Sequence, residues 1–231
     1  MRDLKSNSYN RSVNNSTDLS KSLESLYLKK DYIAVQKKLL ENKDSFDLGV
    51  FHYNLGTILG KQKNFPAARY NLEKASHLGF LDSRLKNNLQ TIKGQLASKD
   101  IDTSDHWQDQ FLNFGLGIPE SFFFTWTLIC ILTVLLLKHF KKLQKMIPIL
   151  ICLFFAIFPL FISQFYFNKI KYAINLKATP LREGPSSIYS EIMTIEAGSK
   201  FIVGESNNGW IYVRYPYFLS GWVKKEFLAM Y

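Results

Sequence analysis

The sequence lacks the patterns that mark the common catalytic centres. Its 231 residues contain no HExxH and no GxSxG pattern, and Gly115 and Gly117 lack the third glycine and the preceding strand of a nucleotide-binding loop. The four histidines, at positions 52, 77, 106 and 139, are dispersed, and no cysteine–histidine pair is available to form a nucleophile. We therefore predict that the protein is not an enzyme and holds no cofactor and no metal ion.

Cysteine is scarce as well. Cys130 and Cys152 are the only two, there is no CxxC pattern, and both lie within long apolar runs. A buried cysteine usually behaves as a small apolar residue, and we interpret both in this way. A disulfide between the two runs, or a redox role, is the alternative.

A nucleic-acid-binding module is also missing. The chain has a formal net charge of +10, from 29 lysines and arginines against 19 acidic residues. These lysines are spread along the chain, and there is no zinc finger, zinc knuckle or basic helix with interleaved aromatic side chains. We expect no nucleic-acid partner.

What the sequence does contain is two long apolar runs. Residues 118–137 and 146–167 carry no charged residue after Glu120, and each reaches the roughly 20 residues that a helix needs to cross about 30 Å of hydrocarbon. The flanking regions are too small and too polar to bury two such helices. We predict transmembrane helices at 118–137 and 146–167.

The loop between the two runs predicts their orientation. Residues 138–145, KHFKKLQK, contain Lys138, Lys141, Lys142 and Lys145. Cytoplasmic loops next to membrane spans carry excess positive charge, whereas the approach to the first run is acidic. We therefore place the loop in the cytoplasm, and both flanking regions outside the cytoplasmic (inner) membrane.

Two observations complicate this orientation. Three lysines follow the second run, at positions 169, 171 and 177, and weaken the charge asymmetry. In addition, residues 1–20 lack the apolar core of a signal peptide, although a long N-terminal region normally needs a signal to be exported. We expect that the gene starts further upstream or that a signal was lost.

The region before the first run is predicted to be helical. Residues 1–20 are rich in Asn and Ser, which predicts disorder, and over 21–97 apolar residues recur at helical spacings. Residues 50–80, VFHYNLGTILGKQKNFPAARYNLEKASHLGF, resemble a tetratricopeptide repeat. The matching positions are Leu55, Gly56, Leu59, Phe65, Ala68, Leu72 and Ala75. The family's pattern is not kept at His52, Lys63 and Phe80.

The tetratricopeptide resemblance implies a partner-binding surface. Residues 29–42 repeat part of the motif 33 residues earlier, close to the family's period of about 34 residues, and residues 83–96 supply a further amphipathic helix. The resemblance thus implies about one and a half to two repeats with a capping helix. They would hold a partner in a concave groove, with the seven matching residues as partner-binding positions. A plain helical bundle without a ligand is the alternative.

Two segments are predicted to be linkers, at 98–117 and 168–177. The first begins with SKDIDTSDHWQDQ, which is acidic and polar. Its His106 is near Asp102, Asp105 and Asp109 in sequence, which could indicate a metal site. We favour a solvated linker, because no helix or hairpin is expected to fix these side chains.

After the second linker the pattern becomes that of short strands. Segments 191–195, 200–205, 210–214 and 220–223 are separated by turn signals, including Asn-Gly at 208–209. We predict five short strands in a small barrel over residues 178–231. The loop from Leu181 to Ser186, and the Gly-Trp pairs at 209–210 and 221–222, resemble the bacterial SH3-like family.

The SH3-like resemblance implies an aromatic-lined groove that binds peptides or the stem peptides of the cell wall. The candidate groove residues are Tyr189, Trp210, Tyr215, Tyr217 and Trp222. For Trp210 and Trp222 a role in the barrel core is an equally good interpretation.

The predicted order is therefore all-α tetratricopeptide hairpins, a two-helix transmembrane hairpin and a small all-β SH3-like barrel in one multi-domain membrane protein. This order resembles the BatE-like proteins of bacterial aerotolerance (Bat) operons. The resemblance implies a non-enzymatic inner-membrane scaffold or adaptor of a cell-envelope stress complex, with both soluble parts in the periplasm. Its partners would be membrane proteins with von Willebrand A domains. The alternative is a sensor or anchor that binds peptidoglycan through the SH3-like module.

Overall fold

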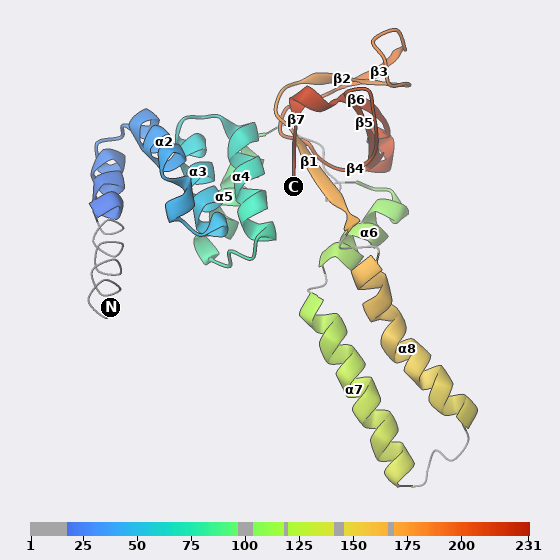
Figure 1. Cartoon of the computed structure of the whole chain (residues 1–231). Helices are drawn as coiled ribbons and strands as arrows, with labels where there is room; N and C mark the ends of the chain where they lie inside the picture. The colour runs from blue at the N-terminus through green and yellow to red at the C-terminus, as the bar shows by residue number, and fades with distance from the viewer. Residues whose placement is uncertain (1–17, 97–103, 118–119, 141–145, 166–168) are drawn as a thin grey trace, which may run out of the picture.

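The computed structural model describes residues 18–96, 104–117, 120–140, 146–165 and 169–231. They form a helical region, a pair of long helices and a β-barrel (Figure 1). Most of the predicted disordered segment 1–20, and residues 141–145 of the basic loop, lie outside the described residues. Residues 18–28 are helical, so the first described helix begins within the segment for which disorder was predicted.

Four further helices make up the N-terminal helical region. They are α2 (Tyr32–Glu41), α3 (Leu48–Lys61), α4 (Phe65–His77) and α5 (Ser83–Gly94), with a short 3-10 turn η1 (Lys43–Ser45) after α2. At the start of α2, α3 and α5, the carboxylates of Asp31, Asp47 and Asp82 accept hydrogen bonds from first-turn N–H groups. Pro66 stands in the first turn of α4, where its missing N–H costs nothing. Each of these helix starts depends only on residues of its own first turn. This explains why sequence patterns locate the helices well.

The core of the helical region lies between α3 and α4. Leu72, Ala68 and Ala75 on α4 are completely buried. A Cβ at Gly56 would lie 2.8 Å from Cγ of Leu72, so the glycine allows α3 to approach α4 closely. The structure places all seven tetratricopeptide-motif residues in this part: Leu55, Gly56, Leu59, Phe65, Ala68, Leu72 and Ala75. They hold the helices together, so a partner would have to use other side chains of the region.

The two long helices are α7 (Glu120–His139) and α8 (Met146–Phe165). Within them, Ser121–His139 and Pro148–Phe165 are long and apolar enough to cross a membrane, with mean hydropathies of 2.0 and 2.2. Only 11% of each segment is buried inside the protein. The helices are joined by a 2.8 Å hydrogen bond from Oγ1 of Thr127 to the carbonyl of Ala156, which is completely buried. Most of their apolar side chains therefore face outward.

The C-terminal part is one antiparallel sheet of seven strands, curled into a barrel. The strands are β1 (Lys171–Asn175), β2 (Thr179–Arg182), β3 (Glu191–Ile195), β4 (Lys200–Asn207), β5 (Trp210–Tyr215), β6 (Gly221–Lys224) and β7 (Leu228–Met230). Their order is β3-β2-β6-β5-β4-β1-β7. The 3-10 turns η4 (Tyr217–Leu219) and η5 (Lys225–Phe227) join the last three strands. Leu181, Phe201, Val213 and Val223 fill the interior.

The β4–β5 turn confirms the hairpin that Asn-Gly predicts. Asn208 and Gly209 have φ values of 43° and 83°, and positive φ at both central residues is what the favoured two-residue hairpin turn requires.

The structure corrects both predicted linkers. Residues 171–175 of the linker 168–177 form β1, which pairs with β4 on one side and β7 on the other. Residues 107–117 of the linker 98–117 form the helix α6 (Trp107–Gly117). With β1 and β7, the sheet has two strands more than the five expected. These segments are short, and the neighbouring strands and the barrel surface supply the contacts that make them regular, so local patterns indicate them weakly.

We expect Gly56→Ala to destabilise the protein by about 1–3 kcal/mol, because the added methyl group would meet Leu72 and push α3 away from α4. Gly94→Ala is the matched control, since nothing lies within 4 Å of a Cβ at that position. Alanine there should be neutral or stabilise by up to about 1 kcal/mol. Urea denaturation of the full chain in detergent, followed by circular dichroism, measures both. Equal effects would contradict the close α3–α4 contact.

Candidate binding groove between the barrel and helix α6

Helix α6 is attached to the barrel through a buried carboxylate. Both Oδ atoms of Asp109 accept hydrogen bonds from the backbone N–H of Tyr217 at the start of η4, at 3.1 and 3.0 Å. The hydroxyl of Ser104 also donates to Asp109, whose side chain is fully buried. One turn further along, Leu112 packs against Ile202 of β4. These contacts fix one face of α6 on the barrel.

A groove of about 830 Å³ lies where α6, the barrel and α8 meet. Its lining residues are Trp107, Gln108, Phe111, Leu112, Ile162, Tyr212, Arg214, Tyr215, Tyr217 and Ser220. The volume is within the range that binds small molecules or short peptide segments. Five of the ten side chains are aromatic, and Arg214 is the only charged one. The groove therefore suits a largely apolar ligand with a negative group.

The structure places only some of the predicted SH3-like groove residues in this groove. Tyr215 and Tyr217 line the groove. Trp222 lies beside it, with its ring 5.5 Å from that of Tyr212 on the neighbouring strand. Trp210 is only 8% exposed, and Nζ of Lys224 lies 5.9 Å from its ring centroid, so this tryptophan is chiefly a core residue.

Tyr189 lies outside the groove. Its ring covers Gly184 in the loop between β2 and β3, and Arg182 donates a hydrogen bond of 2.6 Å to its carbonyl oxygen. In Figure 1 this loop is at the opposite end of the barrel from α6. The predicted set of five residues is thus not a single surface.

Sequence reasoning missed one wall of the groove. Trp107 and Phe111 belong to α6, in a segment that was predicted to be a linker. Their spacing with Phe114, four residues and then three, is typical of one face of a helix and could have revealed it. His106 and Asp109, considered above for a metal, have other contacts: the His106 ring lies 5.4 Å from that of Tyr217. In the described ranges, no three His, Cys, Asp or Glu side chains are close enough to share a metal ion.

A second hollow, of about 270 Å³, lies in the helical region. It is lined by Ser20, Leu23, Glu24, Tyr27, Val35, Leu39, Phe46, Asn54, Thr57 and Ile58. These residues come from the first described helix, α2, α3 and, for Phe46, the turn before α3, and none of them belongs to the seven tetratricopeptide-motif positions. This hollow could receive a partner side chain without involving the motif positions.

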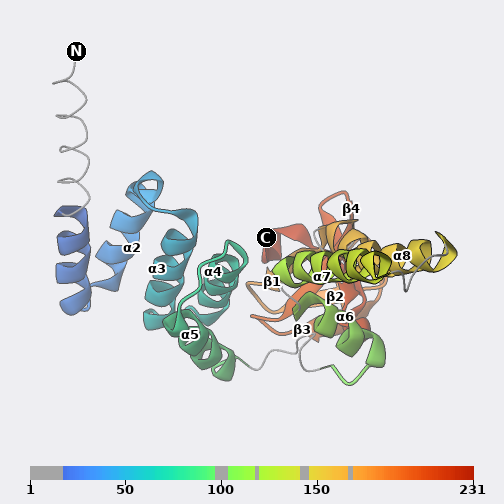
Figure 2. The same cartoon turned by 90° about the horizontal axis from the view of Figure 1, so that it is seen from below.

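The helical region and the barrel are joined by a buried charged cluster around Glu73 of α4. Nζ of Lys200, on β4, donates a hydrogen bond of 2.9 Å to Oε2 of Glu73. Arg69 and Lys93 also pair with Glu73, at 3.6 and 3.8 Å. Arg69 is completely buried, and its Nη1 donates a hydrogen bond of 2.8 Å to the carbonyl oxygen of Gly198. Both views place α4 beside the barrel (Figures 1 and 2).

Aromatic side chains extend this junction. The hydroxyl of Tyr231 donates a 3.4 Å hydrogen bond to Oε2 of Glu73, and its ring stacks on that of Tyr172, with centroids 5.5 Å apart. Nζ of Lys200 lies 4.8 Å from the Tyr172 ring centroid. The hydroxyl of Tyr70 on α4 donates to the carbonyl of Met230 at 3.2 Å. Strands β1 and β7, together with Tyr231, thus contribute to the junction.

The antiparallel sheet defines the C-terminal part as a small all-β barrel, and comparison with known families identifies its type. Residues 177–229 match the family model of the bacterial SH3 domain. This match covers β2 to β6 and the barrel side of the groove, and it confirms the predicted bacterial SH3-like module. Comparisons with curated proteins and with solved structures found no match. The tetratricopeptide and BatE-like resemblances therefore stay predictions.

We expect Glu73→Gln to lower the free energy of unfolding by about 3 kcal/mol, because it removes the carboxylate that neutralises the cations of a buried cluster. Glu41→Gln is the control. Glu41 pairs with Lys37 at 4.0 Å on an exposed helix surface, where such a pair contributes at most about 0.5 kcal/mol. Urea denaturation of the full chain measures the difference. Similar losses in the two variants would contradict the importance of the cluster.

The same cluster predicts how stability depends on pH. Burial acts to raise the pKa of Glu73, but Lys200, Arg69 and Lys93 outweigh it and hold the pKa below its ordinary value of 4.5. Its contribution is therefore complete above about pH 4.5 and is lost as the pH falls through the lower folded-state pKa. Burial, and next the charge of Glu73, raises the pKa of Tyr231 well above 10.0, so stability also falls above that pH. In the Glu73→Gln variant, the part of the stability loss at low pH that comes from Glu73 should be absent. The Glu41→Gln variant should retain it.

Proposed function

We propose that the protein is a non-enzymatic membrane adaptor whose bacterial SH3 domain binds an acidic peptide segment of a partner close to the membrane surface. The observation that carries this proposal is the composition of the groove: α6 and Ile162 of α8 form one side of it, and the barrel forms the other. A ligand in this groove would touch the barrel and the end of the long hairpin at once.

Membrane embedding of α7 and α8 is the first part of the proposal. Large apolar side chains are exposed along both helices, among them Leu128, Leu132, Leu136, Phe154 and Phe158. In water each would forfeit about 1.5–3 kcal/mol of burial energy, and the rest of the described chain does not cover them. A bilayer supplies the missing apolar environment at the length that these helices have.

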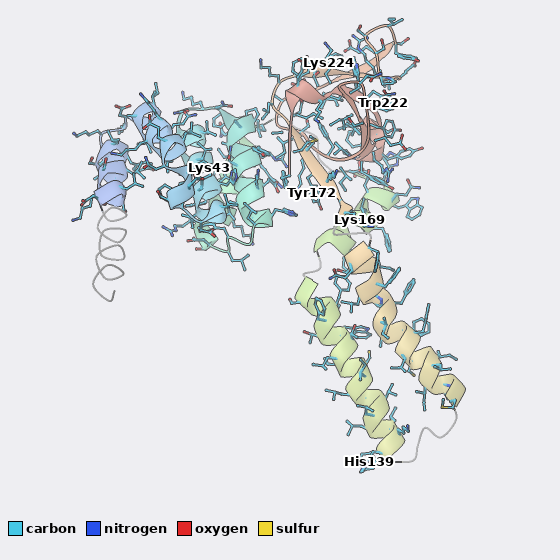
Figure 3. The ribbon with its side chains drawn as sticks, in the orientation of Figure 1. Lys43, His139, Lys169, Tyr172, Trp222 and Lys224 are labelled. Carbon is cyan, nitrogen blue, oxygen red and sulfur yellow. The ribbon has the colours of Figure 1, made fainter. Side chains whose placement is uncertain are left out.

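The proposed orientation follows from charge and from the shape of the hairpin. His139 and Lys169 lie at opposite ends of the hairpin, and the barrel and α6 are at the Lys169 end (Figure 3). Both soluble parts are therefore on the same side of the membrane. The lysine-rich loop 138–145 favours the cytoplasm for the His139 end, which leaves the helical region and the SH3 domain in the periplasm.

The groove chemistry supports a peptide ligand. Tyr212, Tyr215 and Tyr217 present flat surfaces with polar edges, which suit extended peptides. Arg214 can pair with a carboxylate through two parallel hydrogen bonds. By the BatE-like resemblance, the partner would be a membrane protein with a von Willebrand A domain in a cell-envelope stress complex. The helical hollow at 20–58 offers that partner a second contact.

Peptidoglycan is the second candidate ligand, and the family match favours it. Bacterial SH3 domains bind either proteins or cell-wall peptides, and stem peptides also carry carboxylates that Arg214 could bind. In that case the protein would be a cell-wall sensor or anchor. The groove opens beside the end of the hairpin, whereas the cell wall lies at a distance from the bilayer, and for this reason we favour a membrane-proximal protein segment.

We expect the purified full chain to remain in solution when cell-wall sacculi are sedimented, and to bind acidic juxtamembrane peptides of envelope proteins. Tyr217→Ala should weaken peptide binding by about 1–3 kcal/mol, as loss of an aromatic contact at an interface does. Tyr189→Ala is the matched control, since this tyrosine is similarly exposed but lies outside the groove. If the unaltered chain sediments with sacculi and the Tyr217→Ala variant does not, the protein is a cell-wall sensor or anchor instead.

Reporter fusions test the orientation. A fusion at residue 20 and another at residue 231 should both report a periplasmic location, because the hairpin returns the chain to the side from which it entered. Replacing Lys138 by glutamine, together with the three lysines that follow in the loop, should weaken this preference. Cytoplasmic signals from both fusions of the unaltered chain would reverse the proposed topology.

A further inference from the structure

Helix α6 presents an apolar stripe on the face that the barrel leaves uncovered. Trp107, Phe111 and Phe114 follow one another at steps of four and three residues and so share one side of the helix. Their side chains are 72%, 73% and 71% exposed. Asp109 and Leu112, on the opposite side, are buried against the barrel. Three adjacent, exposed aromatic side chains on one short helix are more than an ordinary water-facing surface carries.

The position of α6 indicates what covers this stripe. The helix ends at Gly117 and α7 begins at Glu120, so α6 must lie next to one end of the long hairpin. Figure 1 shows it between that end and the barrel. The side chain of Ile162, near the end of α8, lines the same groove as Trp107 and Phe111. The apolar stripe of α6 therefore continues the apolar surface of the hairpin.

We propose that α6 is an interfacial membrane helix, whose Trp107, Phe111 and Phe114 side chains enter the headgroup region of the bilayer that α7 and α8 cross. This inference rests on the membrane embedding proposed above. Amphipathic helices of this kind bury their apolar face by about 5–10 Å, and tryptophan is enriched at that depth. The helix would lie along the membrane surface, with Asp109 and Leu112 on its other side packed against the barrel.

Neighbouring aromatic and basic side chains lie at the same depth of the membrane as the stripe of α6. Phe122 and Trp126 at the start of α7, and Phe161 and Phe165 at the end of α8, are exposed at this end of the hairpin and continue an aromatic belt. Nζ of Lys169 lies 5.7 Å from the Phe165 ring centroid, and Figure 3 places Lys169 at the junction of hairpin and barrel. A cation at that level is attracted to anionic headgroups. Aromatic and basic groups thus meet where the headgroups would be.

A lipid bilayer is a better candidate than a protein to cover the apolar stripe of α6, because the stripe is continuous with the apolar surface of the hairpin. The stripe adjoins two helices whose outward side chains already require an apolar environment, so the bilayer that covers them reaches α6 without any additional partner. The consequence is mechanical. Through the Asp109 contact with the Tyr217 N–H, α6 would fix the SH3 domain at a constant height above the membrane, with its groove opening at headgroup level.

Site-directed spin labelling of the full chain tests the inference. In a Cys130→Ser, Cys152→Ser background, single cysteines replace Phe111 on α6, Leu132 in the middle of α7, or Ile188 in the β2–β3 loop. All three side chains are apolar and exposed in the protein, so labels there need not disturb the core. The labelled proteins are reconstituted in vesicles of phosphatidylethanolamine and phosphatidylglycerol. The measurement is the ratio of nitroxide collisions with oxygen to collisions with a water-soluble nickel chelate.

The expected order of this ratio is lowest at Ile188, several-fold higher at Phe111 and highest at Leu132, since oxygen partitions into the bilayer and the chelate does not. A ratio at Phe111 equal to that at Ile188, with Leu132 high, would overturn the interfacial helix and leave the membrane anchor intact. Low ratios at Phe111 and Leu132 alike would overturn both. Protection of Phe111 from both reagents would mean that a protein covers the stripe, and would also refute the inference.

Discussion

A carboxylate removed from water needs compensating positive charge, and Glu73 obtains it from both sides of a junction. Arg69 and Lys93 belong to the helical region and Lys200 to the barrel, so the cluster is complete only when the two parts are in contact. Separating them would leave Glu73 without its hydrogen bond to Lys200 and Arg69 without the Gly198 carbonyl. Because incomplete buried charge clusters are costly, this requirement fixes the helical region relative to the SH3 domain.

Asp109 plays the corresponding part for helix α6. Its carboxylate satisfies the Tyr217 N–H and thereby attaches α6 to the turn that follows β5. The barrel therefore makes two contacts through acidic side chains, one to the helical region and one to the segment that leads into the hairpin. The groove lies beside the second contact, so its walls come from three separate parts of the chain. In the adaptor role proposed above, this arrangement would couple the position of a ligand to the membrane without a flexible link.

The elements that could be predicted from the sequence are those whose signals are local. Aspartates 31, 47 and 82 start helices through their own side chains, and Asn208-Gly209 makes a hairpin turn that requires positive φ. Helix α6 and strand β1 were missed, since each is short and becomes regular only against the barrel or between two strands. The groove was predicted in part for the same reason: Tyr215 and Tyr217 line it, whereas Tyr189 is at the other end of the barrel and Trp210 is core.

By itself the sequence determined the order of the parts: a helical region, two apolar helices of membrane-spanning length and a bacterial SH3 domain. Composition and periodicity over 10 to 20 residues are sufficient for this, because burial and helix formation act along the chain. The tertiary structure alone decided which side chains meet. The ion cluster joins residues 69 and 73 to residues 198 and 200, and the groove joins 107 to 217. Contacts over such separations leave no periodic trace in a single sequence, since they depend on how complete elements pack.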